Sequence, residues 1–163
     1  MSQFQKNIFT SFFLLTILLT SSCAELDSHD KSYRFNDSIT LYKNSLRWGQ
    51  WTNLIQLQKP EPGADNTDFE DPAQYNLIKL QKIKVTHIED IGTQMDSNEH
   101  NAKTIFLVEF HFDNSSVITP IHHTVNWWYD EENNLWFTNT ALPKEFKLSE
   151  KQLKTIKLSP HKN

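Results

Sequence analysis

The chain has 163 residues, including 20 acidic residues, 16 lysines and arginines and a single cysteine, and its formal net charge is −4. An acidic body argues against nucleic acid as a partner, and a lone cysteine excludes an internal disulfide, so the fold depends on its hydrophobic core. After the leader described next, the remaining length suits one domain.

The first residues are typical of an export signal. Lys6 is the only charge before a mostly apolar run from Ile8 to Leu19, which is too short to span a bilayer core of about 30 Å as a helix. Small residues follow, and then Cys23. The stretch Leu19-Thr20-Ser21-Ser22-Cys23 resembles the lipobox of bacterial lipoproteins, with Thr20 standing where Leu is usual.

This resemblance implies a lipid anchor on Cys23. Residues 1–22 are then a cleaved signal peptide, Cys23 carries acyl chains such as palmitate, and residues 23–32 form a lipidated tether. Two or more acyl chains give stable anchoring. Ala24, rather than Asp, implies the outer membrane with the body facing the periplasm. The alternative is an ordinary cleaved signal peptide followed by an incidental cysteine.

Two helices are predicted next. The first begins near Tyr33 and ends at Gly49, with Leu41 beside its apolar face. A second, shorter helix carries Trp51, Leu54 and Ile55 on one side and stops before Pro60. Four apolar residues mark one side of the first helix: Phe35, Ile39, Tyr42 and Leu46.

The rest of the domain is predicted to be an antiparallel sheet. Residues 77–91 suit an edge strand, and residues 92–101 a polar loop. Alternating residues from Ile105 to Asp113, turn residues after Phe112 and an aromatic run from Trp127 to Phe137 then predict a three-stranded meander. The register that keeps one face apolar pairs the following residues: Phe112 with Val117, Val108 with Ile121, Thr104 with Val125, Tyr129 with Trp136 and Trp128 with Phe137.

Helices followed by a meander make an α+β fold with the helices packed on one face of the sheet. The stretches Leu46 to Trp51, Trp127 to Glu131 and Trp136 to Pro143 resemble the nuclear transport factor 2-like superfamily, and more narrowly small bacterial lipoproteins with that domain. The resemblance places the domain at residues 33–147 and implies a curved antiparallel sheet wrapped around the helices as a cone with a pocket. It also implies frequent dimers and members that are either enzymes or binding modules.

Four residues are candidates for the pocket: His123, Tyr42, Tyr129 and Trp127. His123 is the one polar titratable candidate on the apolar face. Asp37, near the first helix, is an acid that could approach it. A lone histidine on an apolar face is more often a hydrogen-bonded core residue than a base. The chain is therefore expected to be a non-enzymatic binding or scaffold module of the cell envelope. The alternative is a small isomerase- or dehydratase-type enzyme that uses the pocket histidine.

The sequence indicates no metal site and no cofactor. His122 and His123 point to opposite faces of a strand, so they do not share an ion in regular geometry. Glu109, His111 and His122 share a face, but that face is open. The four acids between Asp65 and Asp71 lack the spacing and central glycine of a calcium-binding loop.

The outer face of the sheet is a candidate interface with a second copy of the chain or an envelope protein. Its candidate residues are Trp128, Phe137, Glu109, His111 and His122. Aromatic residues in a polar surround are typical of contact surfaces. The alternative is that the tail or the loop around Phe69 folds over Trp128, which would then belong to the core. Residues 148–163 form a lysine-rich tail, read either as a contact with anionic lipid or as a solvated terminus.

Overall fold

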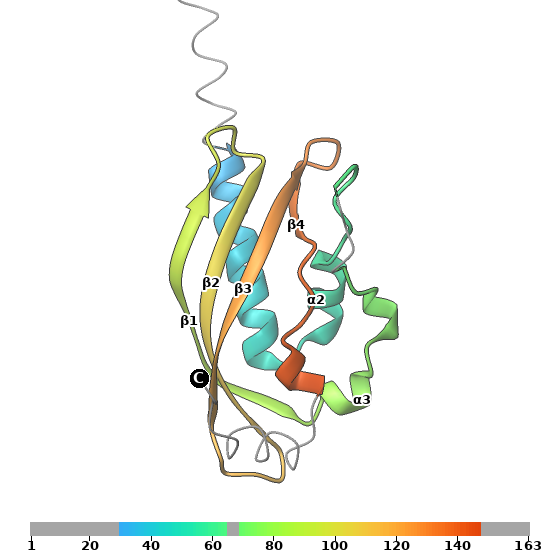
Figure 1. Ribbon diagram of the computed structural model, residues 1–163, viewed down its shortest axis with the longest axis vertical. Helices are drawn as coiled ribbons and strands as arrows, with labels where there is room; N and C mark the ends of the chain where they lie inside the picture. Colours follow the sequence, from blue (N-terminus) through green and yellow to red (C-terminus); the bar gives the residue numbers. More distant parts are fainter. Residues whose placement is uncertain (1–29, 65–68, 148–163) are drawn as a thin grey trace, which may run out of the picture.

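The computed structural model describes residues 30–64 and 69–147. The signal peptide, Cys23 and the basic tail lie outside these residues. The described chain confirms the α+β expectation: N-terminal helices pack against a four-stranded antiparallel sheet in the order β1-β2-β3-β4 (Figure 1). The strands are β1 (Ile83–Met95), β2 (Asn101–Phe112), β3 (Thr119–Asp130) and β4 (Leu135–Thr138).

The N-terminal helix spans residues 30–48 of the described chain and therefore includes positions 30–32, which the sequence assigned to a tether. Its apolar face is confirmed, because Phe35, Ile39, Tyr42 and Leu46 are all buried. Leu41 is 42% exposed and does not belong to that face. Gly49 ends the helix with a φ of +64°, a left-handed conformation that suits glycine.

Shorter helical segments follow. Helix α2 (Trp51–Leu57) buries Trp51, Leu54 and Leu57, so Leu57 takes the inward place predicted for Ile55. A 3₁₀ turn, η1 (Pro72–Gln74), and helix α3 (Leu77–Leu80) lead into the sheet. A last 3₁₀ turn, η2 (Lys144–Lys147), follows β4.

The predicted start of the first strand was wrong, and so was its end. Residues 77–80 are helical because the side chain of Asn76 accepts a hydrogen bond from the backbone N–H of Lys79, 3.1 Å away, and so caps a helix. The strand begins at Ile83 and continues through Gly92 to Met95, where a polar loop was expected. It is an edge strand, as predicted, and its pairing with β2 shifts register twice, which marks two bulges.

The register of the central hairpin is confirmed. Val108 pairs with Ile121 and Thr104 with Val125, without any shift along the β2–β3 ladder. The ladder stops at Phe110 and Thr119, so the predicted pair of Phe112 with Val117 does not form. His111 and Phe112 pair only with β1, and residues 113–118 connect the two strands. Two further predicted pairs form between β3 and β4: Trp128 with Phe137 and Tyr129 with Trp136.

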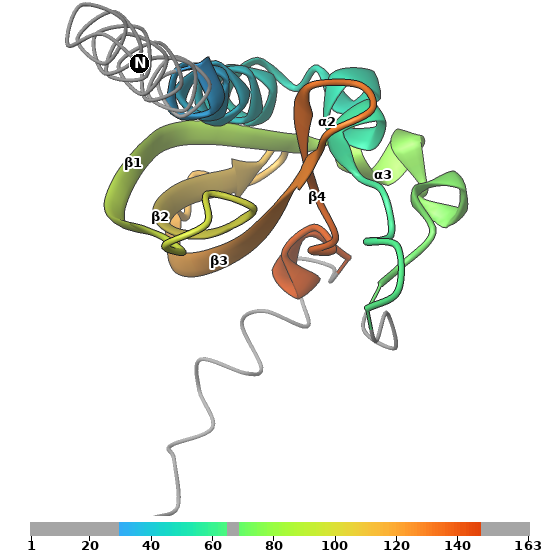
Figure 2. The same cartoon turned by 90° about the horizontal axis from the view of Figure 1, so that it is seen from above.

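The core lies between the sheet and the N-terminal helix. That helix runs behind β2 and β3 in Figure 1, and Figure 2 shows helix and strands as separate layers. Alternate residues of β2 and β3 supply the sheet side, because side chains of a strand alternate between its faces. These residues are Phe106, Val108, Phe110, Val125, Trp127 and Tyr129, all of them buried.

Candidate functional site

Tyr42 and His123 form the buried polar pair that the sequence pointed to. Tyr42 projects from the N-terminal helix and His123 from the inner face of β3, and Tyr42 Oη lies 2.8 Å from His123 Nε2. The Tyr42 ring stacks on Phe106 at 5.6 Å and meets Trp127 edge to face at 5.5 Å. The hydrogen bond gives the Tyr42 hydroxyl and the His123 ring nitrogen each a partner among buried aromatic side chains.

Burial keeps both groups neutral. It lowers the pKa of His123 to about 4, because the imidazolium form loses its hydration. Burial also raises the pKa of Tyr42, so the phenol stays protonated. A general base works best with a pKa near the ambient pH, so the pair is poorly suited to proton transfer at neutral pH. It is well suited to holding the helix on the sheet.

Of the other two pocket candidates, one lies beside the Tyr42–His123 pair and the other does not. Trp127 lies against Tyr42, as expected. Tyr129 does not belong to this group: six residues along β3 place it about 20 Å from His123 at the usual rise of a strand. Its ring packs on Trp136 at 5.3 Å. Asp37 lines a separate groove beside Leu41 and Leu135.

The space between helix and sheet is occupied by aromatic side chains. Tyr42, Phe106 and Phe110 are fully buried there, and Phe146 closes the layer from η2, with its ring centroid 4.9 Å from that of Phe110. An open cleft of about 520 Å³ lies instead beside β3. Its lining is mostly polar: Phe69, His122, His123, Asn126 and residues 139–145.

The cleft exists because β4 is short. β4 pairs with β3 only from Trp127 to Asp130. At Asn126, two threonine hydroxyl groups replace the backbone bonds of the ladder. The backbone N–H of Asn126 donates to Thr140 Oγ1 at 2.8 Å, and Thr138 Oγ1 donates to the carbonyl of Asn126 at 2.7 Å. Beyond this point the chain leaves β3 and borders the opposite side of the cleft.

The expectation that Trp128 and Phe137 stand open to water was wrong. The two rings pack at 5.5 Å on the outer face, yet they are only 7% and 6% exposed. The segment after α2 covers them, since Trp128 Nε1 donates to the carbonyl of Lys59 at 3.1 Å and the Lys59 ammonium lies 3.8 Å from the Phe137 ring centroid. A parallel bridge between Gln58 and Thr138 fixes this cover at the edge of the sheet.

The remaining candidates for the interface lie on the outer face, as predicted. Glu109 and His111 are partly exposed, and His122 is exposed beside the cleft. Within residues 30–64 and 69–147, no group of three or more His, Cys, Asp or Glu side chains is placed to hold a metal ion. None of the helices in these residues is both long and apolar enough to cross a membrane.

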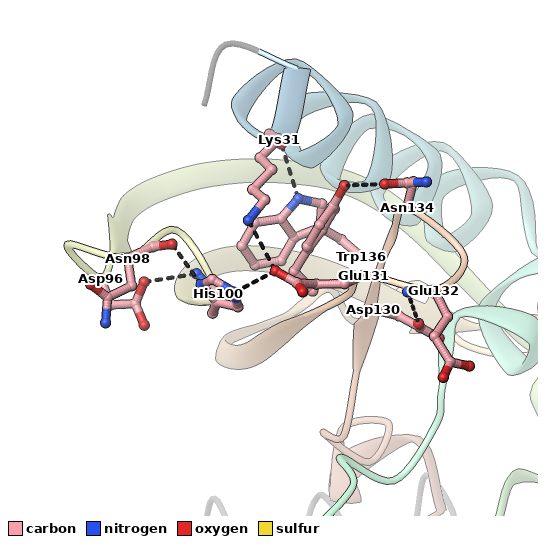
Figure 3. Close-up of polar contacts among 10 residues, drawn as sticks. Lys31, Asp96, Asn98, His100, Asp130, Glu131, Glu132, Asn134 and Trp136 are labelled. Atoms are coloured by element: carbon pink, nitrogen blue, oxygen red, sulfur yellow. Dashed lines mark hydrogen bonds and ion pairs between the residues drawn. The ribbon is translucent and has the colours of Figure 1, made fainter. Parts of the chain in front are cut away.

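A second polar cluster joins the β1–β2 loop and the β3–β4 loop to the start of the N-terminal helix (Figure 3). Glu131 Oε1 lies 2.8 Å from His100 Nε2 and 3.4 Å from the ammonium of Lys31, and these two partners lower the pKa of Glu131. Trp136 Nε1 donates to the carbonyl of Lys31 at 3.0 Å. The cluster was not predicted from the sequence, because its members are about 30 and 100 positions apart and share no local pattern.

Comparison with protein-family models, with curated proteins and with solved structures finds no match to this chain. The site is therefore assigned from its own geometry.

Proposed function

We propose that this protein is a non-enzymatic binding module of the cell envelope, anchored in the outer membrane through lipid on Cys23. The export signal and lipobox support the location, and the α+β body is compatible with a nuclear transport factor 2-like domain. The observation that carries the binding role is the division of space in the domain. Aromatic side chains fill the region between helix and sheet, while the open cleft lies at the edge of β3.

The chemistry of the buried pair supports the same choice. Isomerases and dehydratases of the nuclear transport factor 2-like type place a base in an apolar pocket that admits the substrate. Here one nitrogen of His123 is already bonded to Tyr42, and burial lowers the pKa of the imidazole to about 4. A polar cleft of about 520 Å³ falls in the size range of binding sites.

The second candidate, a small envelope enzyme, is favoured by one observation. His123 contributes to the wall of the cleft, so a molecule bound there would lie near a histidine and the Tyr42 hydroxyl. The isomerase and dehydratase type would use them for proton transfer at a small carbonyl compound.

A kinetic comparison separates the two functions. The full-length protein and its His123→Gln variant are incubated with a panel of small carbonyl compounds, and turnover is followed by proton exchange in NMR spectra. The binding module shows no turnover in either form, because His123 serves packing. A saturable activity that disappears in His123→Gln would refute the proposal, and Tyr33→Phe, which changes a residue that is 61% exposed, serves as the matched control.

A further inference from the structure

Among the described residues, a regular stretch of strand edge beside the cleft has no backbone partner. In β3, odd-numbered residues bond to β2, as the bond from Tyr129 N–H to the His100 carbonyl at 2.8 Å shows for this register. Even-numbered residues therefore direct their backbone groups to the other side. Asn126 is satisfied there by the two threonine hydroxyls, whereas no described residue bonds to the backbone of His122 or Thr124.

The other edges of the sheet are protected. β1 carries two bulges, which disturb the regular spacing that a new strand would need. The outer edge of β4 is covered, because the backbone N–H of Lys59 donates to the carbonyl of Thr138 at 3.0 Å. The free edge of β3 has neither a bulge nor a covering segment among the described residues. Its ladder to β2 runs without a shift, and only Pro120, which lacks an N–H, ends the stretch on one side.

The cleft lies along this unprotected edge. His122 and Asn126, on either side of Thr124, both line it, and residues 139–145 form the opposite wall. Asn139 and Thr140 on that wall offer amide and hydroxyl groups, which match a peptide backbone better than an apolar ligand. The volume of about 520 Å³ is enough for a few residues of extended chain. The recess also restricts access, so a single strand fits better than the edge of a second folded sheet.

We propose that this cleft binds an extended peptide segment of another protein, which adds as a strand to β3. The peptide backbone would bond to His122 and Thr124, and the residues of the facing wall would select its side chains. The inference rests on the proposed binding function and names the class of partner. The partner is recognised mainly through its main chain, so a segment that is extended and free of proline at the paired positions is required.

Amide exchange in the full-length protein tests the inference directly. The probe is the synthetic peptide Lys-Thr-Val-Thr-Val-Thr-Lys, and its matched control has every backbone amide methylated, which keeps the side chains and removes the donors. In the free protein, the amides of His122 and Thr124 should exchange fast, and those of His123 and Val125, which face β2, slowly. At millimolar concentration the probe should slow exchange at His122 and Thr124 by about tenfold or more, and the methylated peptide should not.

Two variants complete the test. Thr124→Pro removes the central donor and should abolish the protection by the probe, whereas Thr124→Val keeps the N–H and should retain it. The methylated peptide keeps the test decisive if Thr124→Pro fails to fold. The inference is overturned if the probe leaves both amides unchanged, or if these amides are already slow in the free protein because residues 148–163 or a second copy hold the edge. Either outcome leaves the proposed function standing, because that function is tested separately by the turnover measurement on His123→Gln.

Discussion

At the scale of single residues, the Tyr42–His123 pair explains how a polar group is accommodated in an aromatic core. The phenol and the imidazole satisfy each other across 2.8 Å, and both stay neutral. The arrangement lowers the stability of the fold only when the pH is low enough for the histidine to take up a proton. His123 therefore links the stability of the fold to pH.

The sign of this effect follows from the two pKa values. The unfolded chain binds a proton at His123 below about pH 6.5, whereas burial lowers the folded value to about 4. The unfolded state thus binds more protons between these values, so the stabilisation is complete above pH 6.5 and is lost as the pH falls toward 4. The loss amounts to about 3 kcal/mol at most, since each pKa unit corresponds to about 1.4 kcal/mol.

His123→Gln removes this titration while the amide still offers a partner to the Tyr42 hydroxyl. Urea unfolding at pH 7.5, 6 and 5 should show a smaller loss of stability with falling pH in the variant than in the parent protein. His122→Gln, at an exposed neighbouring position, should follow the parent. Identical pH dependence in the parent and in His123→Gln would show that the buried histidine does not titrate in this range.

At the scale of elements, the outer face of β3 and β4 is organised by the segment that follows α2. Lys59 covers Trp128 and Phe137 with its carbonyl and its side chain, and the backbone joins the edge of β4. The aromatic pair is thus a small second core on the far side of the sheet. It ties α2 to β4 independently of the main core.

Removing this pair should destabilise the fold. Trp128→Ala is expected to lower the free energy of unfolding by about 3 kcal/mol, and Phe137→Ala by a similar amount, because each change leaves a cavity under Lys59. Trp48→Ala is the matched control: Trp48 is 72% exposed, so its loss should change stability by less than about 0.5 kcal/mol. A double variant that keeps its melting temperature but loses a dimer in sedimentation would instead identify the pair as an association surface.

The elements that the sequence predicted well are those with strict periodicity. The helical face of Phe35 and Tyr42 and the β2–β3 register followed from spacing alone, since any slip would bury polar residues. The start of β1 was wrong because Asn76 caps a helix in a stretch whose apolar pattern also suits a strand. The cover over Trp128 was missed because Lys59 bonds through its backbone carbonyl, which no side-chain pattern reveals.

The same division holds for the candidate site. His123 and Tyr42 were identified because a histidine in an apolar alternation is rare and needs a partner. The cleft was not predicted, since it depends on where β4 stops, and that point is set by the hydroxyl groups of Thr138 and Thr140. Hydrogen bonds between residues that are far apart in the chain leave no local signal in the sequence.

At the scale of the whole molecule, the domain presents a packed interior and a cleft at one side of its sheet. The proposed lipid anchor, Cys23, stands seven positions before the described helix begins. A lipid anchor at that point would hold the domain at the membrane surface and leave the cleft free to bind. The proposed function depends on this arrangement.

The most direct test is membrane fractionation of cells that produce the protein or its Cys23→Ser variant, with metabolic labelling by a fatty acid. The account predicts that the parent protein carries the label and stays with the outer membrane. Cys23→Ser should lose the label and be released, while its purified body melts at the same temperature. Ser22→Ala, which keeps the cysteine, should behave as the parent. A Cys23→Ser protein that still carries the fatty acid and remains in the membrane fraction would contradict the account.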